Sequence, residues 1–227
     1  MRAAALILAA GFGLRLGHDR PKALVAVQGQ PIVARSAATF AAHPGIAELV
    51  VVAPAAELAE VRRLATANAQ VVAGGATRQE SVRAGLAALD PGIEAVLIHD
   101  SARAFAPTAV IDRVLAALAD GAPAVIPVLP MVDAVKQVDA DGAVVATLDR
   151  SALRIVQTPQ GFARAVIDAA HARAQAERRQ DAVDDAALVE ALGQPVRTVE
   201  GDPLAFKITV PADLARAQLL NPAVQDA

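Results

Sequence analysis

The sequence contains no cysteine, tryptophan or tyrosine, and phenylalanine is its only aromatic residue, with five copies in 227 residues. Without cysteine the chain has no disulfide bond, no thiolate nucleophile and no zinc site built on sulfur. Because aromatic side chains are so scarce, the core has to be built from Ala, Val, Leu and Ile, within a hydrophobic content of 55%. A cysteine-free chain fits a reducing compartment, and we expect a cytoplasmic protein.

The sequence also lacks long apolar runs and a strong excess of charge of either sign. No uninterrupted apolar run approaches the 18 residues typical of a membrane-spanning helix. Arg2 followed by Ala3 to Ala10 resembles a short secretory signal, but the run is barely long enough and charged residues crowd directly behind it. The net charge of −3 argues against a general nucleic-acid binder, because such proteins contact phosphates through many Lys and Arg side chains. We therefore expect neither a membrane nor a nucleic acid as partner.

Short apolar segments alternate with amphipathic segments along the first 130 residues. This alternation predicts an α/β fold, with a doubly wound, mostly parallel, Rossmann-like sheet covered on both faces. The expected strands include the run from Leu6, Glu48 to Ala53, Val71-Val72, Ala95 to Ile98 and Ala124 to Val128. The expected helices cover Pro31 to Ala42, Ala55 to Ala67, Gln79 to Leu89 and the segment that Pro107 opens.

The pattern changes after residue 133. Two alternating segments flank Asp139-Ala-Asp-Gly142, which predicts a β-hairpin with glycine where a positive φ is wanted. A two-stranded ribbon is marginal alone in water, so we expect it to pack against a second copy of the chain. The sequence thus predicts one domain over residues 1–227, with a β-arm at about 133–150. Behind the arm we expect helices over Phe162 to Arg178, over Asp184 to Leu192 and from Pro211, and extended segments at Thr198-Val199 and Ala205 to Thr209.

The strongest functional signal lies between Leu6 and Lys22. A short apolar run leads into Ala9 to Gly17, which reads AAGFGLRLG, and Pro21-Lys22 follows. A glycine-rich turn after a strand exposes backbone N–H groups that an anion can approach closely. Arg15 inside the turn and Lys22 behind it add two cations, so we interpret the stretch as a triphosphate site.

Two other phosphate-binding patterns fit this stretch poorly. A dinucleotide fingerprint needs G-x-G-x-x-G and an acidic residue about 20 positions later, whereas the third glycine here is displaced to Gly17 and no acid follows between Gln28 and Arg35. The Walker pattern G-x-x-x-x-G-K-[ST] is absent. A dehydrogenase remains a remote alternative.

Two further polar clusters follow predicted strands. Gly74 to Arg78 leads into the helix that carries Ser81, and His99 to Arg103 follows a later strand. Alone, each has an ordinary structural explanation, such as Asp100 capping a turn or His99 packing at a strand end. Together with the glycine loop they meet at the carboxyl ends of the strands, where open α/β sheets bind ligands.

Several cations, a glycine cradle and one acidic residue suit phosphoryl or nucleotidyl transfer, in which the protein mainly positions groups and stabilises charge. Asp100 can hold Mg²⁺ directly or through water, and a triphosphate can supply the other ligands. No general base is needed if the nucleophile is already an anion.

Six motifs of this sequence occur in the same order as in a known protein family. They are Ala9 to Arg15 with Pro21-Lys22, Gly74 to Ser81, His99 to Arg103, Asp149-Arg150, Gln157-Thr-Pro-Gln160 and Lys207-Ile-Thr209. Together they resemble the 2-C-methyl-D-erythritol 4-phosphate cytidylyltransferases of the non-mevalonate isoprenoid pathway, from the N-terminus to the last predicted helix.

The resemblance implies transfer of CMP from CTP to methylerythritol phosphate, with Mg²⁺ held by Asp100 and pyrophosphate released. It implies that Arg15 and Lys22 stabilise the transition state and that Arg150 and Lys207 aim the attacking phosphate. The family's homodimer exchanges its arms, so Arg150 and Thr158 would serve the partner's site. The implied substrate-binding residues are Ala9, Ala10, Gly11, Gly13, Gly75, Arg78, Ser81, Asp100, Ser101, Arg103 and Thr158, of which Gly75 and Ser81 would read cytosine.

The chain departs from the family pattern at Ala134, Val183 and Ala205-Phe206, where the family usually has Thr, Thr and Asn-Ile, and at Ala104, which replaces a common proline. These departures concern residues expected near the acceptor or the metal, and none of them falls in the motifs that would bind CTP. A cytidylyltransferase acting on a pentitol phosphate such as ribitol 5-phosphate is therefore the main alternative. A nucleotide-binding regulator without catalysis is more remote, because it has no use for cations aimed at an acceptor.

Overall fold

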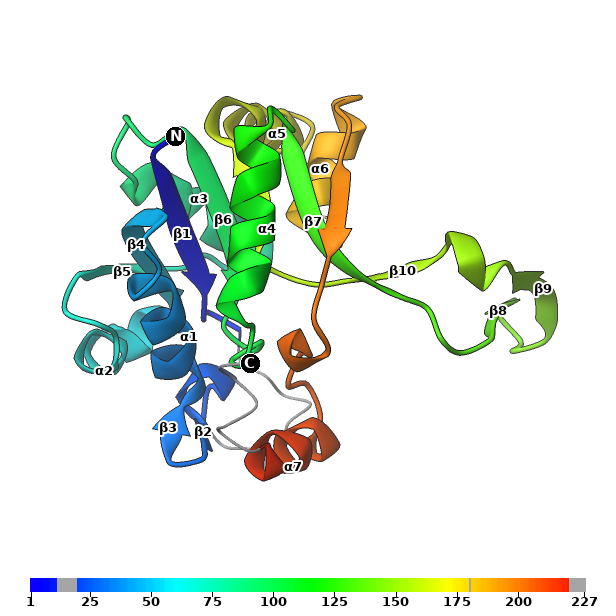
Figure 1. Cartoon of the computed structure of the whole chain (residues 1–227), viewed down its shortest axis with the longest axis horizontal. Helices are drawn as coiled ribbons and strands as arrows, with labels where there is room; N and C mark the ends of the chain where they lie inside the picture. The colour runs from blue at the N-terminus through cyan, green and yellow to red at the C-terminus, as the bar shows by residue number, and fades with distance from the viewer. Residues whose placement is uncertain (12–19, 180, 221–227) are drawn as a thin grey trace.

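The computed structural model describes residues 1–11, 20–179 and 181–220. A central twisted sheet carries helices on both faces, and a ribbon projects from one edge (Figure 1). The predicted α/β architecture is confirmed. The eight-stranded sheet has the order β10 (Arg154–Val156), β7 (Ala124–Pro130), β11 (Gln160–Ala163), β6 (Ala95–Asp100), β1 (Ala3–Leu8), β4 (Ile46–Ala53) and β5 (Ala69–Ala73), with β12 (Arg197–Glu200) also pairing with β7.

The sheet is mixed. Strand β1 pairs in parallel with β4 and β6, β4 with β5, and β12 with β7. Strands β10 and β11 run antiparallel to their neighbours, and the sequence predicts neither. In β11, Gly161 works against a strand prediction because glycine is depleted in strands. Phe162, expected at the start of a helix, lies in β11, and helix α5 (Arg164–Ala176) begins two residues later.

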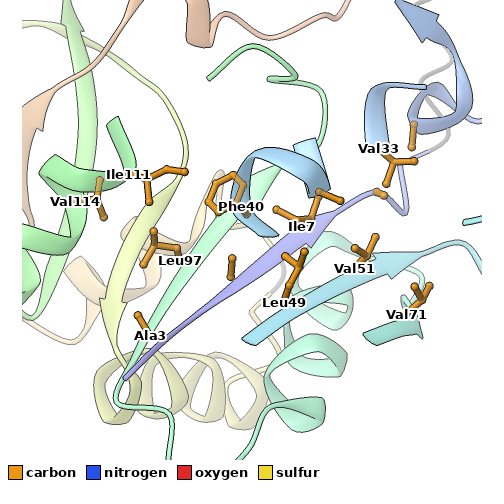
Figure 2. Close-up of a cluster of buried hydrophobic side chains, with 14 of the residues drawn as sticks. Ala3, Ile7, Val33, Phe40, Leu49, Val51, Val71, Leu97, Ile111 and Val114 are labelled. Carbon is orange, nitrogen blue, oxygen red and sulfur yellow. The ribbon is translucent and has the colours of Figure 1, made fainter. Parts of the chain in front are cut away.

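Alternate residues of the strands feed two separate cores, as the period of two in a β-strand requires. On β1, Ala3, Ala5 and Ile7 face one core and Ala4 and Leu6 face the other. Figure 2 shows the first core, where Ile7 and Leu97 lie around Phe40. It is covered by α1 (Ile32–Ala41), α2 (Leu58–Leu64) and α4 (Thr108–Ala119). The second is covered by α3 (Arg78–Ala88), α5 and α6 (Asp185–Ala191).

A third, smaller hydrophobic cluster joins chain segments that lie beyond the carboxyl end of β1 in Figure 1. There α7 (Pro211–Leu219) packs near the short hairpin of β2 (Ala26–Val27) and β3 (Gln30–Pro31). The segment Ala205 to Thr209, expected to be extended, includes the end of the 3₁₀ helix η5 (Pro203–Ala205) and joins no sheet. Two further 3₁₀ helices are η2 (Lys22–Leu24), which follows the residues not described, and η3 (Ala55–Glu57), which precedes α2.

The predicted arm is a hairpin of β8 (Val135–Val138) and β9 (Val144–Leu148), followed by the 3₁₀ helix η4 (Arg150–Ala152). It forms its own two-stranded sheet and extends away from the main body (Figure 1). Gly142 has a φ of 83°, which is the positive value that the sequence predicts for this turn. The arm leaves Val138, Val144 and Val145 more than half exposed, at 52%, 60% and 56%. Among the described helices, none is long and apolar enough to cross a membrane.

Candidate active site

A cavity of about 420 Å³ lies at the carboxyl ends of β1, β5 and β6. The sheet brings these ends together: the Ala9 N–H donates to the Val52 carbonyl at 2.8 Å, and the Ser101 N–H donates to the Leu8 carbonyl at 3.1 Å. The cavity is lined by Leu8, Ala9, Ala10, Gly11, Lys22, Ala23, Gly75, Ala76, Thr77, Arg78, Ser81, Asp100, Ser101, Ala102 and Lys207. Most of the residues expected at the site therefore share one pocket.

The glycine loop begins at the end of β1. A Cβ added to Gly11 would meet nothing within 4 Å, so in the described part of the chain this glycine leaves open space. The remainder of the predicted cradle, including Gly13 and Arg15, lies outside the described residues. Lys22 stands on η2 in the wall of the same pocket.

The start of α3 forms the opposite wall. Thr77 and Glu80 make a reciprocal capping box, in which the Thr77 hydroxyl accepts from the Glu80 N–H at 3.1 Å and Glu80 accepts from the Thr77 N–H at 3.3 Å. The Ser81 hydroxyl accepts from the Gly75 N–H at 3.2 Å and donates to the Thr77 carbonyl at 3.0 Å. These two hydrogen bonds of Ser81 fix the conformation of the loop in this structure, and the contact of Ser81 with a nucleobase stays a prediction. Gly75 also has little room for a side chain, because a Cβ on it would lie 2.3 Å from the Cβ of Glu80.

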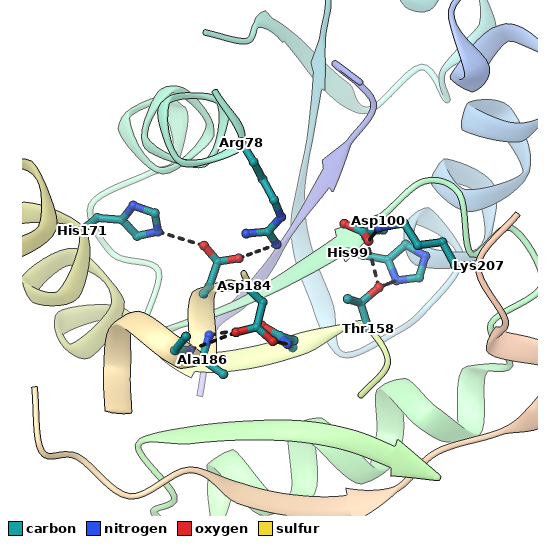
Figure 3. A network of polar contacts seen from close by, with 11 residues as sticks. Arg78, His99, Asp100, Thr158, His171, Asp184, Ala186 and Lys207 are labelled. Atoms are coloured by element: carbon teal, nitrogen blue, oxygen red, sulfur yellow. Dashed lines mark hydrogen bonds and ion pairs between the residues drawn. The ribbon is translucent and has the colours of Figure 1, made fainter. Parts of the chain in front are cut away.

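Asp100 and Lys207 form the charged centre of the pocket (Figure 3). The Lys207 Nζ donates to the Asp100 Oδ2 at 2.6 Å. Burial by itself would raise the pKa of Asp100, but the charges of Lys207, Arg78 and Arg103 outweigh it and lower the pKa to about 2. Asp100 is therefore an anion at any physiological pH.

The backbone of Asp100 is held by Thr158, which also hydrogen-bonds to His99. The Thr158 hydroxyl accepts from the Asp100 N–H and hydrogen-bonds to the His99 Nδ1, both at 3.1 Å. Burial lowers the pKa of His99 to about 4, and its ring packs against Phe40 with centroids 4.8 Å apart. Thr158 is buried and supports the backbone of Asp100 in its own chain, and its expected service to the partner's site stays a prediction. His99 is the packed strand-end histidine of the ordinary explanation.

Arg103 was expected to contact substrate, and it does not line the pocket. Its guanidinium donates to the carbonyls of Ala205 at 2.7 Å and Val156 at 3.2 Å. It therefore ties the segment before Lys207 to the sheet.

Arg78 is held by Asp185, which in turn pairs with His171, and the sequence singles out neither residue. Asp185, fully buried at the start of α6, accepts from Arg78 at 2.7 Å and pairs with the His171 Nε2 at 3.0 Å. Arg78 and His171 point toward the same carboxylate from opposite sides (Figure 3). These partners are 107 and 14 residues from Asp185, so no local motif could reveal them.

Arg150 lies on η4, which follows β9 in the arm, and it is not among the residues that line the pocket of its own chain. Its guanidinium donates to the Val132 carbonyl, at the base of the arm. Within the described chain Arg150 is therefore not brought together with Lys22 and Lys207.

Among the described residues that line the pocket, Asp100 is the one that offers a carboxylate to a metal ion. Among the described residues no group of three His, Cys, Asp or Glu side chains could hold a metal. Mg²⁺ commonly takes one or two carboxylates and completes its coordination with water and substrate phosphates. Ionised Asp100 fits that role for a Mg²⁺ that arrives with a triphosphate.

A glycine loop, two lysines and one ionised carboxylate at the carboxyl ends of an α/β sheet are features of a nucleotidyltransferase. The family model described as IspD, 2-C-methyl-D-erythritol 4-phosphate cytidylyltransferase, matches residues 3–221, and the chain belongs to this family.

Relatives and solved structures agree with this assignment. The 2-C-methyl-D-erythritol 4-phosphate cytidylyltransferase of Nocardia farcinica is 50% identical over 219 residues, which cover 95% of this chain and 92% of the relative. That of Frankia casuarinae is 48% identical over 219 residues, which cover 96% and 81%. The crystal structure of the enzyme of that name from Thermus thermophilus superposes with a TM-score of 0.79 at 38% identity, over all of both chains.

Proposed function

We propose that this chain transfers CMP from CTP to the phosphate of 2-C-methyl-D-erythritol 4-phosphate and releases pyrophosphate. The observation that carries the proposal is the Asp100–Lys207 pair, at 2.6 Å, in the same pocket as Lys22 and the glycine loop. Family membership supplies the names of the substrates. The pocket supplies groups that fit two phosphates and a metal.

The reaction needs positioning more than proton transfer. An oxygen of the acceptor phosphate attacks the α-phosphorus of CTP, and the bond from that phosphorus to the oxygen it shares with the β-phosphate breaks, so that the electron pair leaves with pyrophosphate. The nucleophile is already an anion and needs no general base. This agrees with His99 being enclosed behind Thr158 rather than facing the pocket.

The charged side chains of the pocket each have a role in this scheme. Lys22 stabilises the charge that develops on the α-phosphate and the pyrophosphate. Lys207 exchanges part of its contact with Asp100 for a contact that orients the acceptor phosphate. Arg78, in the pocket wall at the start of α3, binds substrate. Mg²⁺ bound by Asp100 and the phosphate oxygens would neutralise negative charge on the triphosphate. Ala9, Ala10, Gly11, Gly75, Ser81 and Ser101 surround the nucleotide.

The arm supports a proposal about assembly. An isolated two-stranded ribbon with half-exposed valines is marginal in water, and a second copy of the chain would cover it. We infer a homodimer in which Arg150 enters the partner's pocket. We further infer that residues 1–227 act as one domain with this arm. The absence of cysteine supports a place in the cytoplasm.

Pyrophosphate release from CTP and Mg²⁺ tests the activity, with methylerythritol phosphate, ribitol 5-phosphate and no acceptor run in parallel. We expect release with methylerythritol phosphate alone. Release with ribitol 5-phosphate alone would keep the mechanism and replace the acceptor. Silence with every acceptor, in a protein that still binds CTP by calorimetry, would favour a non-catalytic nucleotide-binding protein.

A further inference from the structure

Lys207 is carried by an irregular segment, not by a helix or strand. It lies between η5 and α7 and joins no sheet. A lysine side chain has four rotatable bonds, so a lysine on a loose loop would hold its ammonium group poorly. The position of Lys207 at 2.6 Å from Asp100 therefore calls for anchors on its neighbours.

Backbone anchors lie on both sides of Lys207. The Ala205 carbonyl accepts from Arg103, and the Ile208 N–H donates to the Ala102 carbonyl at 2.9 Å. Ile208 is fully buried in the third hydrophobic cluster. These contacts fix the path of the segment, but none of them acts on residue 206 itself.

Phe206 supplies an anchor of a different kind. Its ring lies parallel to that of Phe105, with an interplanar angle of 4° and centroids 6.4 Å apart, within the range of offset aromatic pairs. The guanidinium carbon of Arg216 lies 4.0 Å from the Phe206 centroid, and that of Arg35 lies 4.7 Å from the Phe105 centroid. Both distances suit a cation–π contact. We call these four residues the arginine–phenylalanine stack.

The composition of the chain makes this stack notable. Two of the five phenylalanines in a sequence without tryptophan or tyrosine are used here, at the edge of the molecule rather than in either large core. Phe206 is only partly buried, so the hydrophobic effect alone does not account for an aromatic ring. Its partner Arg216 belongs to α7, and the stack therefore joins α7 to the turn that follows Asp100.

We propose that Phe206 is a positioning residue for the reaction, and that the arginine–phenylalanine stack sets the place of Lys207 in the pocket. The inference rests on the proposed function of Lys207 as the group that aims the acceptor phosphate. It predicts that loss of the stack impairs use of the acceptor and spares the binding of CTP, because Lys22 and the glycine loop stand on other segments.

The test compares Phe206→Leu, Arg216→Gln and Phe206→Tyr with the unchanged protein. Phe206→Leu keeps an apolar side chain but removes the π face, Arg216→Gln leaves both rings in place, and Phe206→Tyr should restore function. For the first two we expect kcat to fall about tenfold or the acceptor KM to rise by as much. The CTP dissociation constant, measured by calorimetry, should change less than twofold. Equal losses in CTP binding and turnover would indicate general unfolding of the site and overturn the proposal.

A double-variant cycle separates positioning from a merely structural role. If Phe206 acts through Lys207, then Phe206→Leu costs little further turnover in a Lys207→Ala background. The same tenfold loss in both backgrounds would overturn the inference. If Lys207→Ala itself left turnover unchanged, the proposed role of Lys207 would fail instead, so the two failures can be told apart.

Discussion

Lys207 and Asp100 are 107 residues apart in the sequence, yet the lysine Nζ lies 2.6 Å from the aspartate Oδ2 in the wall of the pocket. The pair joins the end of β6 to the segment before α7. The Asp100 side chain is 17% exposed and that of Lys207 is 41% exposed, so water reaches the pair mainly from the lysine side. The pairing therefore has consequences for stability as well as for chemistry.

The first prediction concerns pH. The pKa of Asp100 is about 2 in the folded chain against 3.8 for an unperturbed aspartate, so folding favours the ionised form. The contribution is complete above about pH 4 and is lost as the pH falls toward 2. The stability of the unchanged protein relative to Asp100→Asn should thus shrink by about 2 kcal/mol between pH 5 and pH 2, measured by urea unfolding. A difference that stays constant over this range would contradict the lowered pKa.

The second prediction concerns Thr158. Thr158→Val keeps the shape but removes the hydroxyl that pairs with the Asp100 N–H and His99, and leaves both unsatisfied in a buried place. We expect a loss of about 1–3 kcal/mol in the free energy of unfolding, measured by urea denaturation, whereas Thr158→Ser should lose much less. An increase in the acceptor KM without a change in stability would show that Thr158 contacts substrate instead.

The sequence predicts the strands that read as continuous apolar runs, such as Glu48 to Ala53, because a strand buried on both faces leaves this signature. It does not predict β11, since Gln160 and Gly161 owe their strand conformation to pairing with β6 and β7 on either side. Ala205 to Thr209 shows the opposite error: an apolar segment that finds no neighbouring strand stays irregular.

The residues of the site likewise include some that the sequence predicts and some that it does not. Lys22, Gly75 and Asp100 could be predicted because each follows a strand within a recognisable motif. The partners of Arg78 and Arg103 could not, because Asp185 and the Ala205 carbonyl reach them only through the tertiary fold. Gln157 and Gln160 show the same limit: the first hydrogen-bonds to the backbone of Asp202 and the second to the side chain of Asp184.

The third prediction concerns Lys22. Lys22→Ala should lower kcat by about 10²–10³-fold with a modest change in CTP affinity, because the lysine is aimed at charge that develops in the transition state. The matched control is Arg20→Ala, which removes a nearby cation that pairs with Glu60 at 2.7 Å outside the pocket. We expect that control to change kcat less than twofold. Near-normal turnover of Lys22→Ala would assign the lysine a structural role.

The fourth prediction tests whether Arg150 acts in the partner's pocket. Lys22→Ala and Arg150→Ala chains should each be poorly active alone. In a hybrid dimer, one pocket combines an intact Lys22 with an intact Arg150 from the neighbouring chain, so verified hybrids should recover about half the activity of the unchanged dimer. Hybrids of Lys22→Ala with Lys207→Ala are the control and should recover nothing, since both lysines line the pocket of one chain. If the Arg150 hybrids also stay inactive, Arg150 acts within its own subunit and the arm serves assembly alone.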